Sequence, residues 1–220
     1  MTSMYLPPKI VDVTAKTPVV LRKGKAREKR MIDSVILHQM AVFRGSVVAN
    51  YMNINAHFAV LPDGTIMQLH PADAMLWASN GFNDVGIAIE FAGNFPTDKG
   101  VYHKPADYGR HIPSKAQIDA GRELVGYLKG QWDLDFVFAH RQGYVSDTRL
   151  SGRNPFRSEL RQGSVPSKQI NQRSNCPGPH IWYGVGEWAI HNLGMSDGGA
   201  GYKLADGDPI PDSWRKAPTT

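Results

Sequence analysis

The sequence has one cysteine and no long apolar run, and each scarcity excludes a class of structure. A single cysteine among 220 residues cannot form an internal disulfide. A membrane-spanning helix needs about 18 or more consecutive apolar residues, and the sequence contains no such run, so no membrane insertion is expected. The first 13 residues lack the charged region and apolar stretch of a secretory signal. We therefore expect synthesis in the cytoplasm, with any export by another route.

Charge is moderate overall but unevenly placed. The chain carries 25 Lys and Arg against 20 Asp and Glu, and 41% of its residues are hydrophobic, which is typical of a globular protein. Residues 15–30 hold seven basic side chains and one acidic, and residues 141–175 hold seven basic and two acidic. These segments predict a basic surface patch. Such a patch is either a solvated surface or a site of attraction to a polyanion, such as nucleic acid, an anionic wall polymer or a membrane surface.

Short apolar runs alternate with a helical pattern, which predicts an α/β fold: a single domain with a mixed central β-sheet flanked by helices. Asp63-Gly64 between two apolar runs predicts a hairpin. Ser114 with Gln117 three residues later predicts a helix start, and the helical spacing continues to Gly130. The expected strands cover 33–38, 57–61, 65–69, 85–92 and 135–140, and a second helix is expected over 180–193.

The remaining segments show no sustained periodicity. Residues 141–175 form a long basic stretch, which we interpret as a functional insertion loop because structureless loops of this length are uncommon in compact domains. We expect a basic N-terminal extension over 1–32, a main domain over 33–194 that contains this loop, and a tail rich in Gly, Pro and Asp over 195–220 that lies on the surface or stays mobile.

Two of the expected strands end in histidine. His38 and His140 close these strands, and ligands of open α/β sheets gather outside the carboxyl ends of strands. Cys176 opens the turn-rich sequence Cys-Pro-Gly-Pro. Two imidazoles and one thiolate would hold zinc with its fourth position open, as in catalytic sites. The alternative is that both histidines are structural core groups and that the cysteine serves as a small buried hydrophobe.

Five motifs occur in a fixed order along residues 33–193. They are Val35-Ile-Leu-His38, His57-Phe58 with Asp63-Gly64, Ile87-Ala-Ile-Glu90-Phe-Ala-Gly93, Ala139-His140-Arg141 and Cys176-Pro-Gly-Pro-His180. Together they resemble the motifs of the zinc-dependent N-acetylmuramoyl-L-alanine amidases, a superfamily that includes bacteriophage lysozyme-amidases and the peptidoglycan recognition proteins. The resemblance implies that His38, His140 and Cys176 bind Zn²⁺.

The resemblance also suggests catalytic residues. It implies that Glu90 accepts a proton from the zinc-bound water and passes it to the leaving amine. A strand carboxylate that faces solvent or pairs with a loop arginine is the alternative for Glu90. Family members usually have a tyrosine where Ala56 precedes His57, so this role is absent or belongs to Glu90. Ser174 and Arg173 are candidates to polarise the substrate carbonyl.

The implied activity is hydrolysis of the amide between N-acetylmuramic acid and L-alanine in peptidoglycan, as in a phage-type lysin. The protein would then act on the bacterial cell wall, after holin release or as part of a virion. A peptidoglycan-binding protein of the same fold without catalysis is one alternative. A basic nucleic-acid-binding protein is another, but only the charge clusters favour it, since no regular interleaving of aromatic and basic residues is present.

Two other histidines lie within the motifs. The resemblance implies that His57 packs structurally and that His180 is not a metal ligand.

Overall fold

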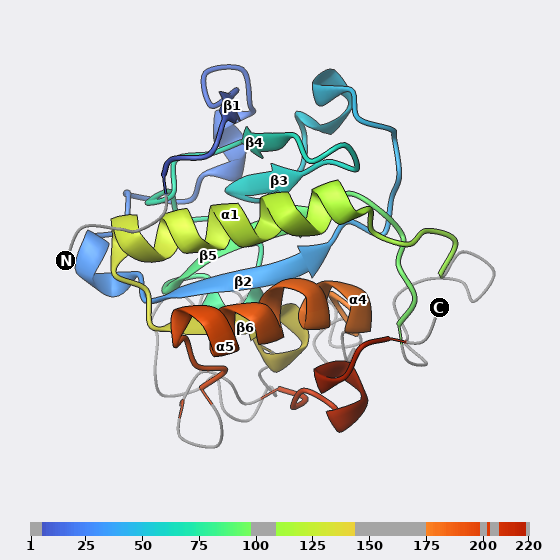
Figure 1. The fold of residues 1–220 in the computed structure, drawn as a ribbon. Coiled ribbons are helices and arrows are strands. Elements are labelled where there is room, and N and C mark those ends of the chain that lie inside the picture. Colours follow the sequence, from blue (N-terminus) through green and yellow to red (C-terminus); the bar gives the residue numbers. More distant parts are fainter. Residues whose placement is uncertain (1–5, 98–108, 144–174, 199–201, 203–206, 219–220) are drawn as a thin grey trace, which may run out of the picture.

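A mixed sheet of six strands forms the centre of the protein (Figure 1). The structure is a computed structural model that describes residues 6–97, 109–143, 175–198, 202 and 207–218. Its strands are β1 Ile10–Asp12, β2 Ser34–Gln39, β3 Phe58–Val60, β4 Ile66–Gln68, β5 Gly86–Phe91 and β6 Phe136–Ala139. Their order in the sheet is β1-β4-β3-β5-β2-β6, and only β3 and β4 pair in antiparallel fashion.

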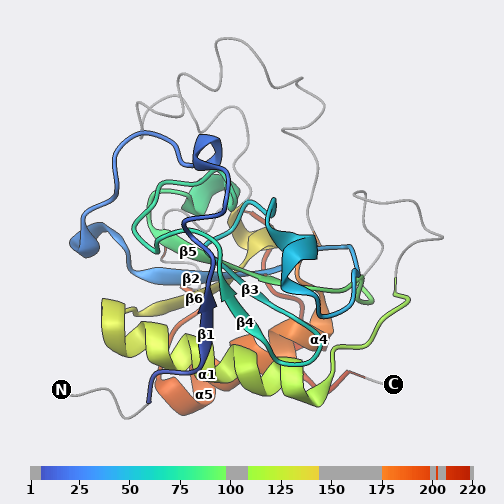
Figure 2. The same cartoon turned by 90° about the horizontal axis from the view of Figure 1, so that it is seen from above.

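The α-helices lie on one face of this sheet, whereas loops and short helical turns cover the other face (Figure 2). The α-helices are α1 Lys115–Trp132, α4 Pro179–Ile181 and α5 Trp188–Leu193, and the π-helical turn η7 Trp182–Glu187 joins α4 to α5. The 3₁₀ turns are η1 Val19–Leu21, η2 Lys29–Met31, η3 Val48–Tyr51, η4 Asn80–Phe82, η6 His140–Gly143 and η9 Asp212–Arg215. Within the described residues, no helix is both long and apolar enough to cross a membrane.

The predicted elements are present, with small shifts at their ends. The hairpin around Asp63-Gly64 is formed by β3 and β4. The Ser114 hydroxyl accepts a hydrogen bond from the backbone N–H of Gln117 and so caps α1, as predicted. The helix passes through Gly130 and ends at Trp132, because the next residue, Asp133, has a φ of 59° that breaks the helical repeat. The prediction that α1 ends at Gly130 was therefore wrong by two residues, and Trp132 packs against the core.

The sheet alternates its side chains between two apolar layers. Leu37 of β2 and Ile89 of β5 belong to the core cluster that packs under α1. Ile36 and Ala88, one residue earlier on each strand, belong to clusters on the opposite face. Because side chains alternate along a strand, the side chains that follow Leu37 and Ile89 point away from the helices. His38 thus lies on the face that the loops cover.

Both ends of the chain contribute to the core, which sequence patterns did not indicate. β1, in the segment expected as an extension over 1–32, pairs in parallel with β4 and so forms an edge of the sheet. In the tail expected to stay on the surface, the side chains of Met195, Ile210 and Trp214 are buried in the core cluster under α1. The prediction of a surface tail is therefore wrong for these three residues.

Two side chains counted toward the basic patch are buried. The Arg27 guanidinium donates to the carbonyl oxygens of Ala72 and Gly86 and contacts the His57 ring. The Arg141 guanidinium lies 4.7 Å from the Trp214 ring centre, in a cation–π arrangement. Both cations serve packing, so neither contributes to an exposed basic surface. Most of the predicted insertion loop, residues 144–174, lies outside the described residues.

Candidate metal centre

The sheet brings the three predicted ligands together. His38 lies near the end of β2, His140 directly follows β6, and Cys176 lies in the turn before α4. One potential ligand atom from each residue lies within 4.8 Å of the others. The centres of the two imidazole rings are 4.5 Å apart. The predicted cluster is confirmed, and it forms because β2 and β6 are parallel neighbours whose carboxyl ends meet at one edge.

Backbone contacts hold Cys176 against the sheet. The backbone N–H of Gln39 donates to the Cys176 Sγ at 3.2 Å, and the Gln39 side-chain amide donates to the carbonyl oxygen of Pro177. On the other side, the Arg141 N–H donates to the carbonyl oxygen of Cys176. Gly178 has a φ of 87°, and a Cβ there would lie 2.6 Å from the Pro96 carbonyl oxygen, so the turn requires glycine.

Burial controls the protonation of all three side chains. It lowers the pKa of His38 well below its usual range and lowers that of His140 to about 4. Both rings are therefore neutral at neutral pH, as metal binding requires. Burial, followed by the charge of Glu90, raises the pKa of the Cys176 thiol well above its usual range. A bound metal cation deprotonates such a thiol outright, so this donor set suits a soft divalent ion such as zinc.

Two residues that the sequence analysis missed contact the imidazoles. Nε2 of His38 lies 2.9 Å from the Ser79 hydroxyl, and Nε2 of His140 lies 2.9 Å from the Asn80 side-chain amide. Ser79 is held in turn, because its N–H donates to the Asn83 side-chain oxygen. Metal-ligating histidines usually engage an outer partner through their second ring nitrogen. These contacts leave Nδ1 of each ring for a metal.

Glu90 lies beside this cluster. It is the register partner of His38 across β5 and β2, and its Oε1 is 4.0 Å from Nδ1 of His38. Its Oε2 is buried and has no hydrogen-bond partner among the described residues. Burial raises the pKa of this carboxyl to about 8. A buried carboxyl oxygen with no hydrogen-bond partner, next to three ligand-type residues, is typical of a functional site.

The other predicted site residues divide into two groups. Ser174 and Arg173 lie outside the described residues. The His57 ring is buried and accepts a hydrogen bond from the Ala88 N–H, which agrees with the structural role expected for it. Within the described part of the chain, His180 is not a member of the metal-type cluster.

Comparison with known proteins decides the family. The family model described as N-acetylmuramoyl-L-alanine amidase matches residues 28–179, which is more than half of the chain. The chain belongs to this amidase family. The matched segment contains Glu90 and all three residues of the cluster. No curated protein matches the chain at the sequence level.

Solved structures of the amidase family and its relatives share the fold. N-acetylmuramoyl-L-alanine amidase LysC from Clostridium intestinale URNW is 16% identical, with a TM-score of 0.53 over 86% of this chain and 99% of that one. The endolysin amidase LysCS of the same organism is also 16% identical, with a TM-score of 0.51 over 86% and 97%. Drosophila PGRP-LB is 15% identical, with a TM-score of 0.50 over 82% and 92%. These likenesses agree with the single α/β domain predicted from the sequence.

Proposed function

We propose that this protein is a zinc-dependent amidase that hydrolyses the bond between N-acetylmuramic acid and L-alanine in peptidoglycan, as a phage-type lysin does. The observation that carries the proposal is the position of Glu90 beside the cluster of His38, His140 and Cys176, with a buried Oε2 that has no hydrogen-bond partner among the described residues. Membership of the amidase family supports the substrate. The bacterial cell wall is then its place of action.

The residues present fit a catalytic zinc ion. His38 and His140 would bind through neutral imidazoles and Cys176 through a thiolate, which leaves one tetrahedral position open. Ser79 and Asn80 would orient the two rings. Zinc at such a site acts as a Lewis acid toward the amide carbonyl and makes a bound water more acidic.

Glu90 would move the proton. Its Oε2 is the atom without a partner, so it can accept the proton that the attacking water loses. A nearby cation favours the ionised form of the carboxyl, which is the form that acts as a base. The protonated carboxyl of Glu90 then returns the proton to the nitrogen of the departing L-alanine. One carboxyl thus serves as base and acid in turn.

The test compares Glu90→Gln with Glu123→Gln, which changes an exposed carboxyl on α1. Purified cell walls are digested with each zinc-loaded protein, and mass spectrometry follows the release of peptides with a free N-terminal L-alanine. We expect Glu90→Gln to retain one zinc per chain and to lose about 100- to 10,000-fold in rate, because its amide accepts no proton. Glu123→Gln should match the wild type.

Two results would contradict the proposal. A wild-type protein that binds walls and zinc but releases no such peptides is a peptidoglycan-binding protein without this activity. If Glu90→Gln hydrolyses walls at the wild-type rate, a group other than Glu90 transfers the proton.

A further inference from the structure

A cavity lies on the helix side of the sheet, away from the metal centre. Its volume is about 490 Å³, within the range of about 300–1,000 Å³ that small-molecule sites occupy. It opens between the C-terminal part of α1 and the strands β1, β3 and β4. Phe58, which lines the cavity, belongs to the core cluster under α1, whereas His38 points to the opposite face of the sheet. A molecule in this cavity is therefore separated from the metal centre by the sheet.

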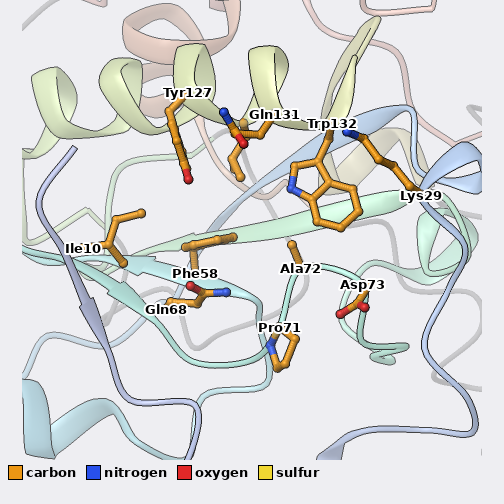
Figure 3. A pocket seen from close by; sticks show the side chains of 11 residues that line it. Ile10, Lys29, Phe58, Gln68, Pro71, Ala72, Asp73, Tyr127, Gln131 and Trp132 are labelled. Atoms are coloured by element: carbon orange, nitrogen blue, oxygen red, sulfur yellow. The ribbon is translucent and has the colours of Figure 1, made fainter. Parts of the chain in front are cut away.

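The cavity combines aromatic walls with amide groups. Tyr127 and Trp132 come down from α1, and Phe58 forms part of the floor (Figure 3). The side chains of Gln131 and Gln68 reach the same space from α1 and β4 (Figure 3). Tyr127 and Trp132 are partly exposed, whereas Phe58 is buried.

The charge of the lining is balanced. Lys29 is its only cation and Asp73 its only carboxylate. The Lys29 ammonium lies 5.9 Å from the Trp132 ring centre, so its charge is already engaged in a cation–π contact. A polyanion such as nucleic acid finds no net positive charge here.

We propose that this cavity binds a neutral saccharide, and specifically an N-acetylhexosamine unit of a glycan strand. Sugar rings present an apolar face that suits Tyr127 and Trp132, while Gln68, Gln131 and Asp73 can exchange hydrogen bonds with hydroxyl and acetamido groups. The choice of N-acetylhexosamine among saccharides rests on the proposed function, since the glycan of peptidoglycan consists of such units.

A glycan held here is not the segment being cut. The sheet separates the cavity from Glu90, so the bound unit belongs to another part of the strand or to a neighbouring strand of the wall. A second contact with the same polymer raises the effective concentration of substrate at the catalytic face. The cavity would thus keep the enzyme on the wall between cleavage events.

The experiment titrates the zinc-loaded full chain with tri-N-acetylchitotriose, a peptide-free oligomer that contains no bond for the amidase to cut. Binding is followed by tryptophan fluorescence and calorimetry. The key variant is Gln131→Ala, because Gln131 is exposed and alanine favours the helix, so folding is not at risk. The matched control is Asn192→Ala, another exposed amide on a helix, outside the cavity. Trp132→Ala is the stronger second variant.

We expect saturable binding to the wild type, binding about five- to tenfold weaker in Gln131→Ala, and binding unchanged in Asn192→Ala. Trp132→Ala should bind at least tenfold more weakly, while its circular dichroism stays native. Cellotriose, which lacks acetamido groups, should bind more weakly than tri-N-acetylchitotriose to the wild type.

Three results would overturn the proposal: no saturable binding, equal binding by Gln131→Ala and the wild type, or equal binding of cellotriose. Because no amide is cleaved in this assay, its outcome is independent of the amidase test. If the protein hydrolyses cell walls but does not bind the saccharide, the proposed amidase function stands and the proposed saccharide site is wrong.

Discussion

The ionisation of Glu90 should dominate the pH dependence of stability in the metal-free protein. Its side chain is only 19% exposed, and burial raises its pKa from 4.5 to about 8. Since the folded state then binds the proton more tightly than the unfolded state, Glu90 favours folding below pH 4.5, and this contribution is lost as the pH rises to about 8. A shift of this size corresponds to a loss of at most about 5 kcal/mol.

Glu90→Gln removes this titration while keeping the shape of the side chain. We expect urea denaturation of the metal-free proteins to give similar free energies of unfolding near pH 5. At pH 9 the variant should be more stable than the wild type by several kcal/mol, up to the limit of about 5 kcal/mol. Saturating zinc should reduce the difference, because a cation beside the carboxylate stabilises its charged form.

The control for this measurement is Glu123→Gln on α1, which changes an exposed carboxyl and should leave the pH dependence as in the wild type. A difference between wild type and Glu90→Gln that stays constant from pH 5 to pH 9 would refute the reasoning. It would mean that water solvates Glu90 in the folded protein.

Three further predictions concern the partners of the two imidazoles, the C-terminal tail and the basic segment over 141–175. Ser79→Ala and Asn80→Ala should each weaken zinc affinity by about 10- to 100-fold in a chelator competition, because each removes an outer partner of an imidazole. Unchanged affinity would mean that packing alone holds the rings. Trp214→Ala should lower the free energy of unfolding, measured by urea denaturation, by about 3–5 kcal/mol, since the ring is fully buried. A loss below about 1 kcal/mol would show that the tail packs only loosely. Replacing residues 145–170 by a Gly-Ser linker should preserve the circular dichroism and the zinc content but slow wall hydrolysis, most at low salt, because basic side chains attract the acidic wall over a Debye length. A shortened protein with full activity at every salt concentration would show that this charge is only a solvated surface.

The central part of the site could be predicted because it follows from strand ends. His38 and His140 each close an apolar run, and parallel neighbours bring their carboxyl ends to one edge. Glu90 could be placed by alternation, since bulky residues occupy every second position of β5. Cys176 could be proposed as a third ligand because it is the single cysteine of the chain, but nothing local shows that its turn returns to the sheet.

Other features depend on contacts that leave no local pattern. Ser79 and Asn80 lie in an irregular segment before β5, and only the fold shows that they reach the imidazoles. β1 is three residues long, too short for alternation to identify, and its strand conformation depends on pairing with β4. Trp214 follows a stretch rich in Gly, Pro and Asp, so its burial becomes evident only from its contact with Arg141 and the core.

The register of β2 makes the assembly of the site inseparable from the assembly of the sheet. Leu37 packs under α1 and His38 faces the other way, so a slip of one residue would exchange the two side chains. The slipped chain would bury an imidazole in an apolar layer and present a leucine beside Glu90. Such a chain loses core packing and a metal ligand together, so the packing of Leu37 also keeps His38 in the metal centre. A molecule with β2 out of register should therefore fail both to fold stably and to bind metal.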